Sequence, residues 1–541
     1  MVDTSAPSGA AVSSQDVSAV AADAGWSASV SAAAALDETG TSSLPAPADA
    51  AAHAVRVETQ KALRNGVKLA FSMASTLAVA FAVRFWLPRV LGPELFGQTH
   101  FSDTFAAGWL AFTQLGADTY ISREVAIRKE HASEFFGSLL IARAIASLLV
   151  FAGIAIMLHA MGKDALEWQM VFIFAAANVL FVLNTSLGTL LQAVGKVNEL
   201  AVSNVVTKVL WGVSVIGGVA LGGGIRMVAL GFLLSEGVRS VSLARAARRH
   251  VDLRIRLHLD GFQAILITCV PYFLHSVAHK VYASVNVTMI SWLVNDQEVG
   301  FYGAAINVAL IALLVMPVLQ SVVVPMGARI GKASVEALNE TMRATVRIAL
   351  IFSVPMALLL ALNSGTVVHI LYKDGYAPAA HSLRVLGLLI PLTATLTIGA
   401  MHLIQLGRIW TLSKVSITAM VINPAVSIFL IPYGAKHWGL GGAGLAASIC
   451  TVLSETAVAV MIVSSLGRAA VDRASVKLVA TLAGVGLVVV GVHFALPPLG
   501  FGKIVIEGVV WSLLAMPLGA LPLVPIAKKV AARVSRRARS R

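Results

Sequence analysis

The chain has 541 residues, of which 57% are hydrophobic and only 13% are charged, and its mean hydropathy is +0.82. Soluble domains are about 45–50% apolar and about a quarter charged, so this composition excludes an ordinary soluble globular protein. The net charge of +14 does not indicate nucleic-acid binding, because the basic residues lie in short polar segments between long apolar ones. These apolar stretches repeat at the length of about 20 residues that a helix needs to cross a bilayer.

The sequence gives no indication of a metal site or a disulfide bond. Cys269 and Cys450 both lie inside apolar stretches, so we expect two buried thiols and no metal site. The sequence also lacks a phosphate-binding glycine loop, a zinc-type His–Glu spacing and a nucleophile elbow. We therefore expect a protein that is not an enzyme and that uses no cofactor.

Fourteen apolar spans follow an N-terminal segment that is rich in Ala, Ser, Asp and Pro. Residues 1–60 predict a disordered cytoplasmic tail, since they lack the basic and apolar regions of a signal peptide. The predicted spans are residues 69–88, 101–121, 138–158, 167–191, 200–221, 226–245, 264–293, 301–325, 345–362, 382–404, 410–432, 440–466, 476–496 and 504–525. The fold class is thus an all-α polytopic membrane protein with about 14 transmembrane helices.

The distribution of basic residues supports this count. Lys and Arg gather in short cytoplasmic loops, and alternate connections of this chain receive most of its 41 basic residues. The cytoplasmic set includes Lys196, Lys208 and the dense run from Arg239 to Arg256, whereas the other side receives few residues, such as Lys163. Both termini are therefore predicted to be cytoplasmic, and the basic tail at residues 527–541 is expected to lie against anionic lipid headgroups.

A faint internal repeat divides the chain. The segment Leu91–Gly97 after the first span resembles Asn295–Gly303 after the seventh, and Leu234-Ser235-Glu236 resembles Leu453-Ser454-Glu455. Both pairs are six helices apart, which is the arrangement of parallel repeats related by an axis along the membrane normal. We expect two pseudo-repeated six-helix lobes around a central cavity, followed by two further helices. The corresponding ranges are residues 61–257, 258–467 and 468–526.

At several motifs the chain resembles bacterial polysaccharide flippases of the Wzx type, within the superfamily of multidrug, oligosaccharidyl-lipid and polysaccharide exporters. These motifs are Leu91-Gly92-Pro93-Glu94-x-Phe96-Gly97, Gly116…Tyr120-x-x-Arg123-Glu124-x-Ala126, Glu298-Val299-Gly300-Phe301-Tyr302-x-Ala304-Ala305 and Asn423-Pro424…Leu430-Ile431-Pro432…Gly442-Ala443-Gly444. The resemblance covers residues 61–525. It implies a flippase of the bacterial inner membrane that moves undecaprenyl-diphosphate-linked oligosaccharide repeat units from the cytoplasmic to the periplasmic leaflet. A polysaccharide polymerase and the export machinery are its candidate partners.

Candidate cavity residues concentrate in the seventh span. His275, His279, Tyr282 and Asn286 are spaced to share one helical face, and Lys280 lies about 100° around from His279. A cationic, hydrogen-bonding stripe suits a diphosphate and sugar hydroxyls. The alternative for the histidines is hydrogen bonding to neighbouring helices. Where such exporters often carry an acidic residue in this span, the chain has Asn286.

Arg84 and Arg143 are the other cations predicted at membrane depth. If their side chains face inward, they extend the positive surface along a substrate path. The alternative is that each side chain reaches to the nearest membrane interface.

Two acidic residues, Glu236 and Glu455, occupy equivalent positions in the repeat and are candidates for ion coupling. Glu236 has Arg239 three residues later, which predicts an ion pair. Glu455 has no basic residue within one turn, so its partner must come from another helix or the carboxyl must be neutral. Glu455 is therefore the preferred coupling candidate.

Three other functions are weighed against the flippase. An ion-coupled exporter of cationic drugs needs a net acidic cavity, which disagrees with Lys280 and the two arginines. A flippase for the peptidoglycan lipid precursor shares the cationic requirement and stays open. A membrane glycosyltransferase would need a large external loop or clustered acidic residues, and the sequence shows neither.

Overall fold

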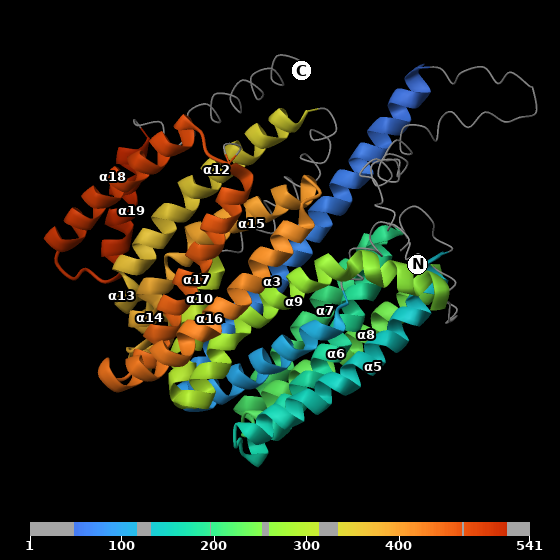
Figure 1. Ribbon diagram of the computed structural model, residues 1–541, viewed down its shortest axis with the longest axis horizontal. Coiled ribbons are helices and arrows are strands. Elements are labelled where there is room, and N and C mark those ends of the chain that lie inside the picture. Colours follow the sequence, from blue (N-terminus) through green and yellow to red (C-terminus); the bar gives the residue numbers. More distant parts are fainter. Residues whose placement is uncertain are drawn as a thin grey trace, which may run out of the picture. The chain divides into compact units, whose positions relative to one another are not determined.

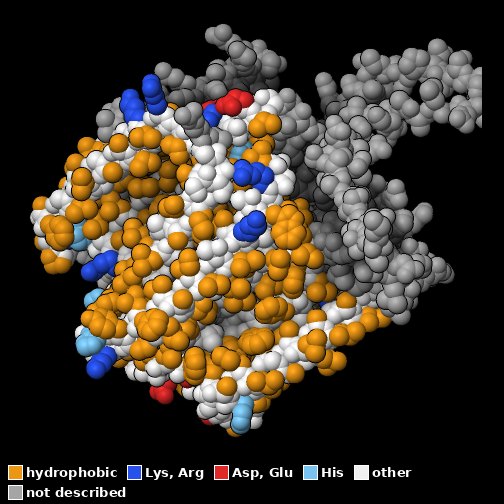
Figure 2. Space-filling model, in the orientation of Figure 1, with side chains coloured by type: hydrophobic (Ala, Val, Ile, Leu, Met, Phe, Trp, Pro, Cys, Tyr) orange, Lys and Arg blue, Asp and Glu red, His pale blue; other side chains and the backbone are white. Residues whose placement is uncertain are grey.

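The computed structural model describes residues 48–115, 131–194, 196–250, 259–312, 334–467 and 470–516. Every regular element within these ranges is helical (Figure 1), which confirms the predicted fold class. By length and composition, nine of the described helices are able to cross a membrane, and one bent helix pair makes a tenth. Hydrophobic side chains cover most of the face drawn in Figure 2, as a lipid-facing surface requires. From Asn65 onward the chain forms one compact unit.

The first half of this unit contains helices that lie side by side in Figure 1, with α8 packed along both α6 and α7. The long helix α3 contains a kink at Gly92, where φ is 74° and ψ is 171°, so it is in fact two helical arms. Glycine adopts this conformation without the steric cost that a side chain would add. The elements are α3 (Ala48–Leu110), η1 (Ala111–Thr113), α5 (His131–Ala160), α6 (Ala165–Ala193), α7 (Val197–Ala220) and α8 (Arg226–His250).

The second half is arranged around α16, which packs along α9 and α17. In the same half α12 packs along α15, and the last two helices, α18 and α19, pack against each other and against α12. The elements are α9 (Leu259–Leu293), α10 (Asp296–Ala312), α12 (Val335–Leu362), α13 (Ser364–Tyr372), η2 (Asp374–Tyr376), α14 (Ala379–Leu386), α15 (Leu389–Gln405), α16 (Ile409–His437), α17 (Gly442–Leu466), α18 (Arg473–Ala495) and α19 (Phe501–Ala515).

Each of the fourteen predicted spans falls on a helix, in whole or in its described part, but two predictions need correction. The tenth span is not one helix, because α14 and α15 meet at a bend of 40°. Pro391 has no N–H to bond the carbonyl of Gly387, which accepts from Ile390 at 3.2 Å instead. The tail predicted as disordered to residue 60 is helical from Ala48, where an alanine-rich segment begins after Pro47. Residues 1–47 and 527–541 lie outside the described ranges.

The two halves meet in a close crossing of glycines at the end of the bundle where α3 kinks, here called the Gly92 end. A Cβ added to Gly97 would lie 1.7 Å from the carbonyl oxygen of Asp296, and one added to Gly300 would lie 1.9 Å from that of Pro93. Gly300 follows Gly97 by the same number of positions as Asp296 follows Pro93. Such reciprocal contacts are what a two-fold relation between repeats produces. They support the two lobes, residues 61–257 and 258–467, which we retain as a proposal.

Polar contacts also join the halves at the Gly92 end. Lys163 Nζ lies 2.7 Å from Glu167 Oε1, and it donates to Ser291 Oγ at 2.7 Å and to Asp296 Oδ1 at 3.4 Å. The Tyr376 hydroxyl donates to the carbonyl of Pro88 at 3.1 Å, within a group of packed aromatic rings. These bonds connect α3 and α6 with α9, α10 and η2.

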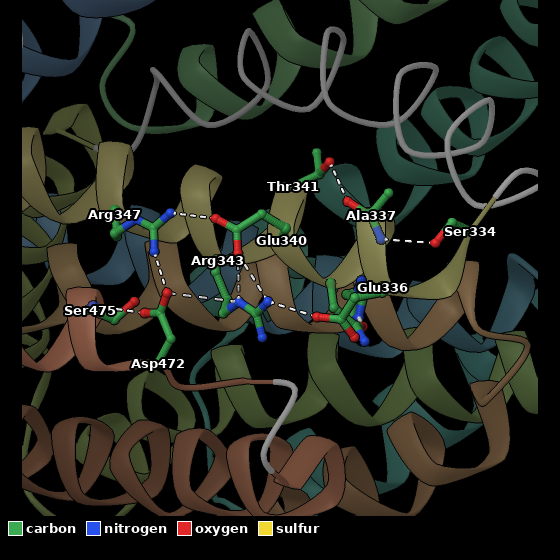
Figure 3. A network of polar contacts seen from close by, with 11 residues as sticks. Ser334, Glu336, Ala337, Glu340, Thr341, Arg343, Arg347, Asp472 and Ser475 are labelled. Carbon is green, nitrogen blue, oxygen red and sulfur yellow. Dashed lines mark hydrogen bonds and ion pairs between the residues drawn. The ribbon is translucent and has the colours of Figure 1, made fainter.

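The α18–α19 hairpin is fastened to the rest of the unit at both ends. Arg347 on α12 donates to Glu340 and to Asp472 Oδ2, the latter at 2.7 Å (Figure 3). Hydrogen bonds from Ser475, with Arg347 beside them, lower the pKa of the Asp472 carboxyl from its usual value to about 2. Charge-assisted contacts to a capping carboxylate fix the place where α18 begins.

At the other end of the hairpin, Glu507 of α19 is fully buried. Its carboxylate accepts from Asn363 Nδ2 at 2.6 Å and lies 2.7 Å from His493 Nδ1. A buried carboxylate is tolerated inside a membrane protein when its oxygens are hydrogen-bonded in this way. Glu507 therefore joins α19 both to α18 and to the junction of α12 and α13.

The glycine crossing predicts that a substitution at Gly97 lowers the stability of the protein. Replacing Gly97 with alanine adds about 1 kcal/mol of helix propensity, but the new Cβ would overlap the Asp296 carbonyl. We expect a net loss of about 1–3 kcal/mol from overpacking, measured as a lower apparent melting temperature of the detergent-purified protein.

Gly491→Ala in α18 is the matched control, because a Cβ at Gly491 would meet no atom within 4 Å. Its melting temperature should equal or exceed that of the unaltered protein. Equal melting temperatures for Gly97→Ala and Gly491→Ala would show that the crossing does not constrain the fold.

Candidate functional site

A cavity of about 460 Å³, here called the central cavity, is lined by α3, α6, α7, α8, α9 and α10. Both arms of α3 contribute to it, so residues from the two sides of the Gly92 kink face the same space. Aromatic and aliphatic side chains form much of its wall. Its polar and charged lining consists of Arg84, Thr99, His100, Asp103, Thr104, Lys208, Lys280, Ser284 and Asn307.

Three cations from three helices project into the central cavity. Arg84 lies on the first arm of α3, Lys208 on α7 and Lys280 on α9. None of them forms an ion pair with a described residue, and Lys208 instead lies over the Trp211 ring at 3.7 Å from its centroid. Asp103 is the one carboxylate among the described lining residues, and it interacts electrostatically with all three cations. The described lining thus has an excess of positive charge, which an isolated apolar wall would not tolerate without water or an anion.

The structure thus brings together two of the predicted site residues, Arg84 and Lys280, and adds two that sequence reasoning missed. Lys208 was assigned to a cytoplasmic connection, although it lies about three turns inside α7. Asp103 lies inside the second predicted span. A charged side chain well inside an apolar span was the available signal for both residues.

Arg143 lies elsewhere. Its side chain is buried and donates to the Ser186 hydroxyl and, at 3.0 Å, to the carbonyl of Gln114. These bonds hold α5 to α6 and to the residues that follow η1. Arg143 does not line the central cavity.

A second cavity of about 290 Å³, here called the histidine cavity, lies between α9, α15, α16 and α17. His275, His279 and Tyr282 line it from α9, as the predicted shared face requires. His275 Nδ1 lies 2.7 Å from Ser416 Oγ, and the Tyr282 hydroxyl donates to Glu455 Oε1. Neighbouring rings along α9 are 6.1 Å and 5.7 Å apart. The partner of Glu455 is therefore a tyrosine on another helix.

Asn286, the fourth residue of the predicted face, is buried and lines neither cavity. Its amide donates to Thr451 Oγ1 at 2.7 Å, and its carbonyl oxygen accepts from Ser427 at 2.9 Å. These contacts join α9 to α16 and α17. Asn286 acts in helix packing in this arrangement.

Glu236 differs from Glu455 in its surroundings. Its Oε2 accepts from Asn184 Nδ2 at 2.7 Å and lies 3.6 Å from Arg239 Nη1. Arg239 also donates to Asn204 at 2.9 Å. The predicted ion pair with Arg239 is present, and it joins α6, α7 and α8.

The sequence matches two protein-family models. A model described as "Polysaccharide biosynthesis protein" matches residues 62–331, and the MatE model matches residues 271–429. A search of curated proteins gives no significant match.

Three solved structures with a similar fold are distant from this chain in sequence. A lipid II flippase, MurJ, in an inward closed conformation is 14% identical and has a TM-score of 0.57, covering 82% of this chain and 98% of its own. A multidrug resistance MATE family transporter of the MOP superfamily, in an inward-facing conformation, is 18% identical and has a TM-score of 0.54, covering 75% and 98%. An outward-facing structure of such a transporter is 18% identical, with a TM-score of 0.53 and coverage of 74% and 92%.

The two family models together cover residues 62–429, and the polytopic helical fold agrees with both. The chain is thus similar to polysaccharide biosynthesis proteins over residues 62–331 and to MatE proteins over residues 271–429, and its fold is that of the MATE transporter and MurJ structures.

Proposed function

We propose that the protein flips undecaprenyl-diphosphate-linked oligosaccharide repeat units from the cytoplasmic to the periplasmic leaflet for surface polysaccharide biosynthesis. It does so as a multi-pass protein of the bacterial inner membrane with both termini in the cytoplasm. The observation that carries this proposal is that three cations, Arg84, Lys208 and Lys280, line one cavity together with a single carboxylate, Asp103.

The chemistry of a diphosphate matches this cavity. Its oxygens carry negative charge and accept hydrogen bonds from ammonium and guanidinium groups, which are strengthened where water is scarce. Hydroxyl and amide groups of Thr99, Thr104 and Asn307 line the same space and suit sugar hydroxyls. The volume of about 460 Å³ is within the usual range of ligand sites, so the diphosphate and adjoining sugars fit while the polyprenyl chain stays in lipid.

Two alternatives make different predictions. A drug exporter of the MATE kind would have to hold a cationic substrate beside three cations, which costs free energy unless Asp103 and water compensate. A flippase for the peptidoglycan lipid precursor needs the same cations, and the similarity of the fold to MurJ keeps this alternative open.

A deletion strain separates these functions. Loss of surface polysaccharide, with lipid-linked units accumulating on the cytoplasmic leaflet, supports the proposal. Loss of cell-wall synthesis indicates the peptidoglycan precursor. Normal polysaccharide with increased sensitivity to cationic drugs indicates a drug exporter.

Removing each of these cations singly should slow transport. Lys280→Ala and Lys208→Ala each leave the diphosphate without one charge-assisted contact of about 1.5–3 kcal/mol, so we expect a loss of at least about tenfold in flipping rate. Lys280→Arg keeps the charge and should be milder. Flipping is measured in proteoliposomes with the lipid-linked glycan.

Lys414→Ala is the control, because Lys414 is exposed on α16 and lines neither cavity. Its flipping rate and membrane insertion should match those of the unaltered protein. A normal rate in Lys280→Ala would remove Lys280 from the substrate site.

We further propose that Glu455 couples transport to a proton gradient. Its carboxylate, the hydrogen-bonded Tyr282 hydroxyl and the two histidines line one cavity, so a proton bound there has several partners. Glu236 is instead paired with Arg239, so a proton on its carboxyl would not have such a set of partners.

Glu455→Gln fixes the site in a neutral form. We expect the variant to fold and to flip substrate slowly, with no acceleration when a pH gradient is imposed on proteoliposomes. Glu94→Gln, an exposed carboxylate at the Gly92 end, should keep the full acceleration. Equal acceleration in both variants would exclude Glu455 as the coupling group.

A further inference from the structure

A groove of about 950 Å³ opens on the outer surface between α7 and α8, apart from both cavities. It lies where α7 begins and α8 ends, which is the end predicted to be cytoplasmic. Exposed valines and a leucine form its apolar part, and polar residues gather toward the end of α8. The lining is Asn198, Glu199, Val202, Ser203, Leu234, Gly237, Val238, Val241, Ser242, Arg245, Ala246 and Arg249. No lining residue is shared with the central cavity or the histidine cavity.

Positive charge marks one end of this groove. Arg245 and Arg249 are one turn apart on the same face of α8, and neither forms a hydrogen bond or ion pair with a described residue. The one acidic residue of the lining, Glu199, is engaged by His250, whose Nε2 lies 2.6 Å from Glu199 Oε1. The two guanidinium groups are therefore available for an anion.

The lining of the groove also contains an unsatisfied polar group. Ser203 is 4% exposed, and its hydroxyl has no hydrogen-bond partner among the described residues. A buried hydroxyl without a partner is destabilising, so a ligand that supplies one is favoured here. The backbone N–H groups at the start of α7 have no side-chain cap, and they add partial positive charge nearby.

The apolar part of the groove has the length of an acyl chain within one leaflet. From Arg245 back to Leu234, α8 advances by about 16 Å at 1.5 Å per residue. Half of a hydrocarbon core of about 30 Å is about 15 Å. Val241, Val238 and Leu234 are all exposed along this path, and Val202 of α7 faces the same groove.

We propose that the groove binds one anionic glycerophospholipid, with its phosphate on Arg245 and Arg249 and an acyl chain along Leu234, Val238 and Val241. Basic pockets between transmembrane helices on the cytoplasmic side recognise such headgroups. A zwitterionic lipid would bring its ammonium group toward two arginines. This inference does not depend on the proposed function.

Native mass spectrometry of the purified, delipidated full-length protein tests the proposal. Phosphatidylglycerol or phosphatidylcholine is added in separate experiments, and the bound lipid is counted. We expect the unaltered protein to retain about fivefold more phosphatidylglycerol than phosphatidylcholine. The double variant Arg245→Gln with Arg249→Gln should lose this preference, because its charge-assisted contacts to the phosphate are removed.

Gly237→Leu tests the contribution of the apolar part of the groove without changing its charge. A Cβ at Gly237 would meet no atom within 4 Å, so the leucine side chain fits and fills the groove while both arginines stay. We expect about a threefold or larger loss of bound phosphatidylglycerol, since the acyl chain loses apolar contact. The elution volume of each variant on size exclusion reports that it is folded.

Lys414→Gln with Lys477→Gln is the matched control, because it removes two exposed charges at the same end of the bundle. The proposal is overturned if this control loses as much phosphatidylglycerol as the arginine pair, or if Gly237→Leu binds as the unaltered protein does. Preferential retention of undecaprenyl phosphate over phosphatidylglycerol would also overturn it, since the occupant would then be a polyprenyl lipid.

Discussion

The close crossing of Gly97 and Gly300 is the contact on which the arrangement of the halves depends. Without side chains at these two positions, the second arm of α3 and α10 approach until backbone atoms touch. The same approach brings His100 against Gly303, one turn further along each helix. Lys163 and Tyr376 then reach partners in the other half. The kink at Gly92 is a precondition, because it ends the first arm of α3 and changes the direction of the chain just before Gly97.

The central cavity follows from this geometry. Since the two arms of α3 separate from the kink, Arg84 on one arm and Asp103 on the other face the same space. Helices α7 and α9 complete the wall and bring Lys208 and Lys280. In hydrocarbon such charges cost several kcal/mol each, and here all of them face one common cavity instead.

Much of the fold could be predicted from sequence, because the bilayer imposes a fixed length and polarity on each span. The predicted face of His275, His279 and Tyr282 was also present, since helical periodicity fixes it. What periodicity could not show is what lies opposite each residue. Asn286 continues the same face, but at its level α16 and α17 are packed against α9 and no cavity is open. Lys208 was missed because charge counting treated it as a loop residue.

Helix α9 forms a wall between the two cavities. Consecutive residues on it face different spaces, with His279 in the histidine cavity and Lys280 in the central cavity. The helix contains Pro271, whose carbonyl accepts from Ser413 of α16 at 2.6 Å. A rotation of α9 that changes the exposure of one residue must change that of the other. By thermodynamic reciprocity, an ion that favours one position of α9 and an anionic substrate that favours the same position raise each other's affinity by the same factor.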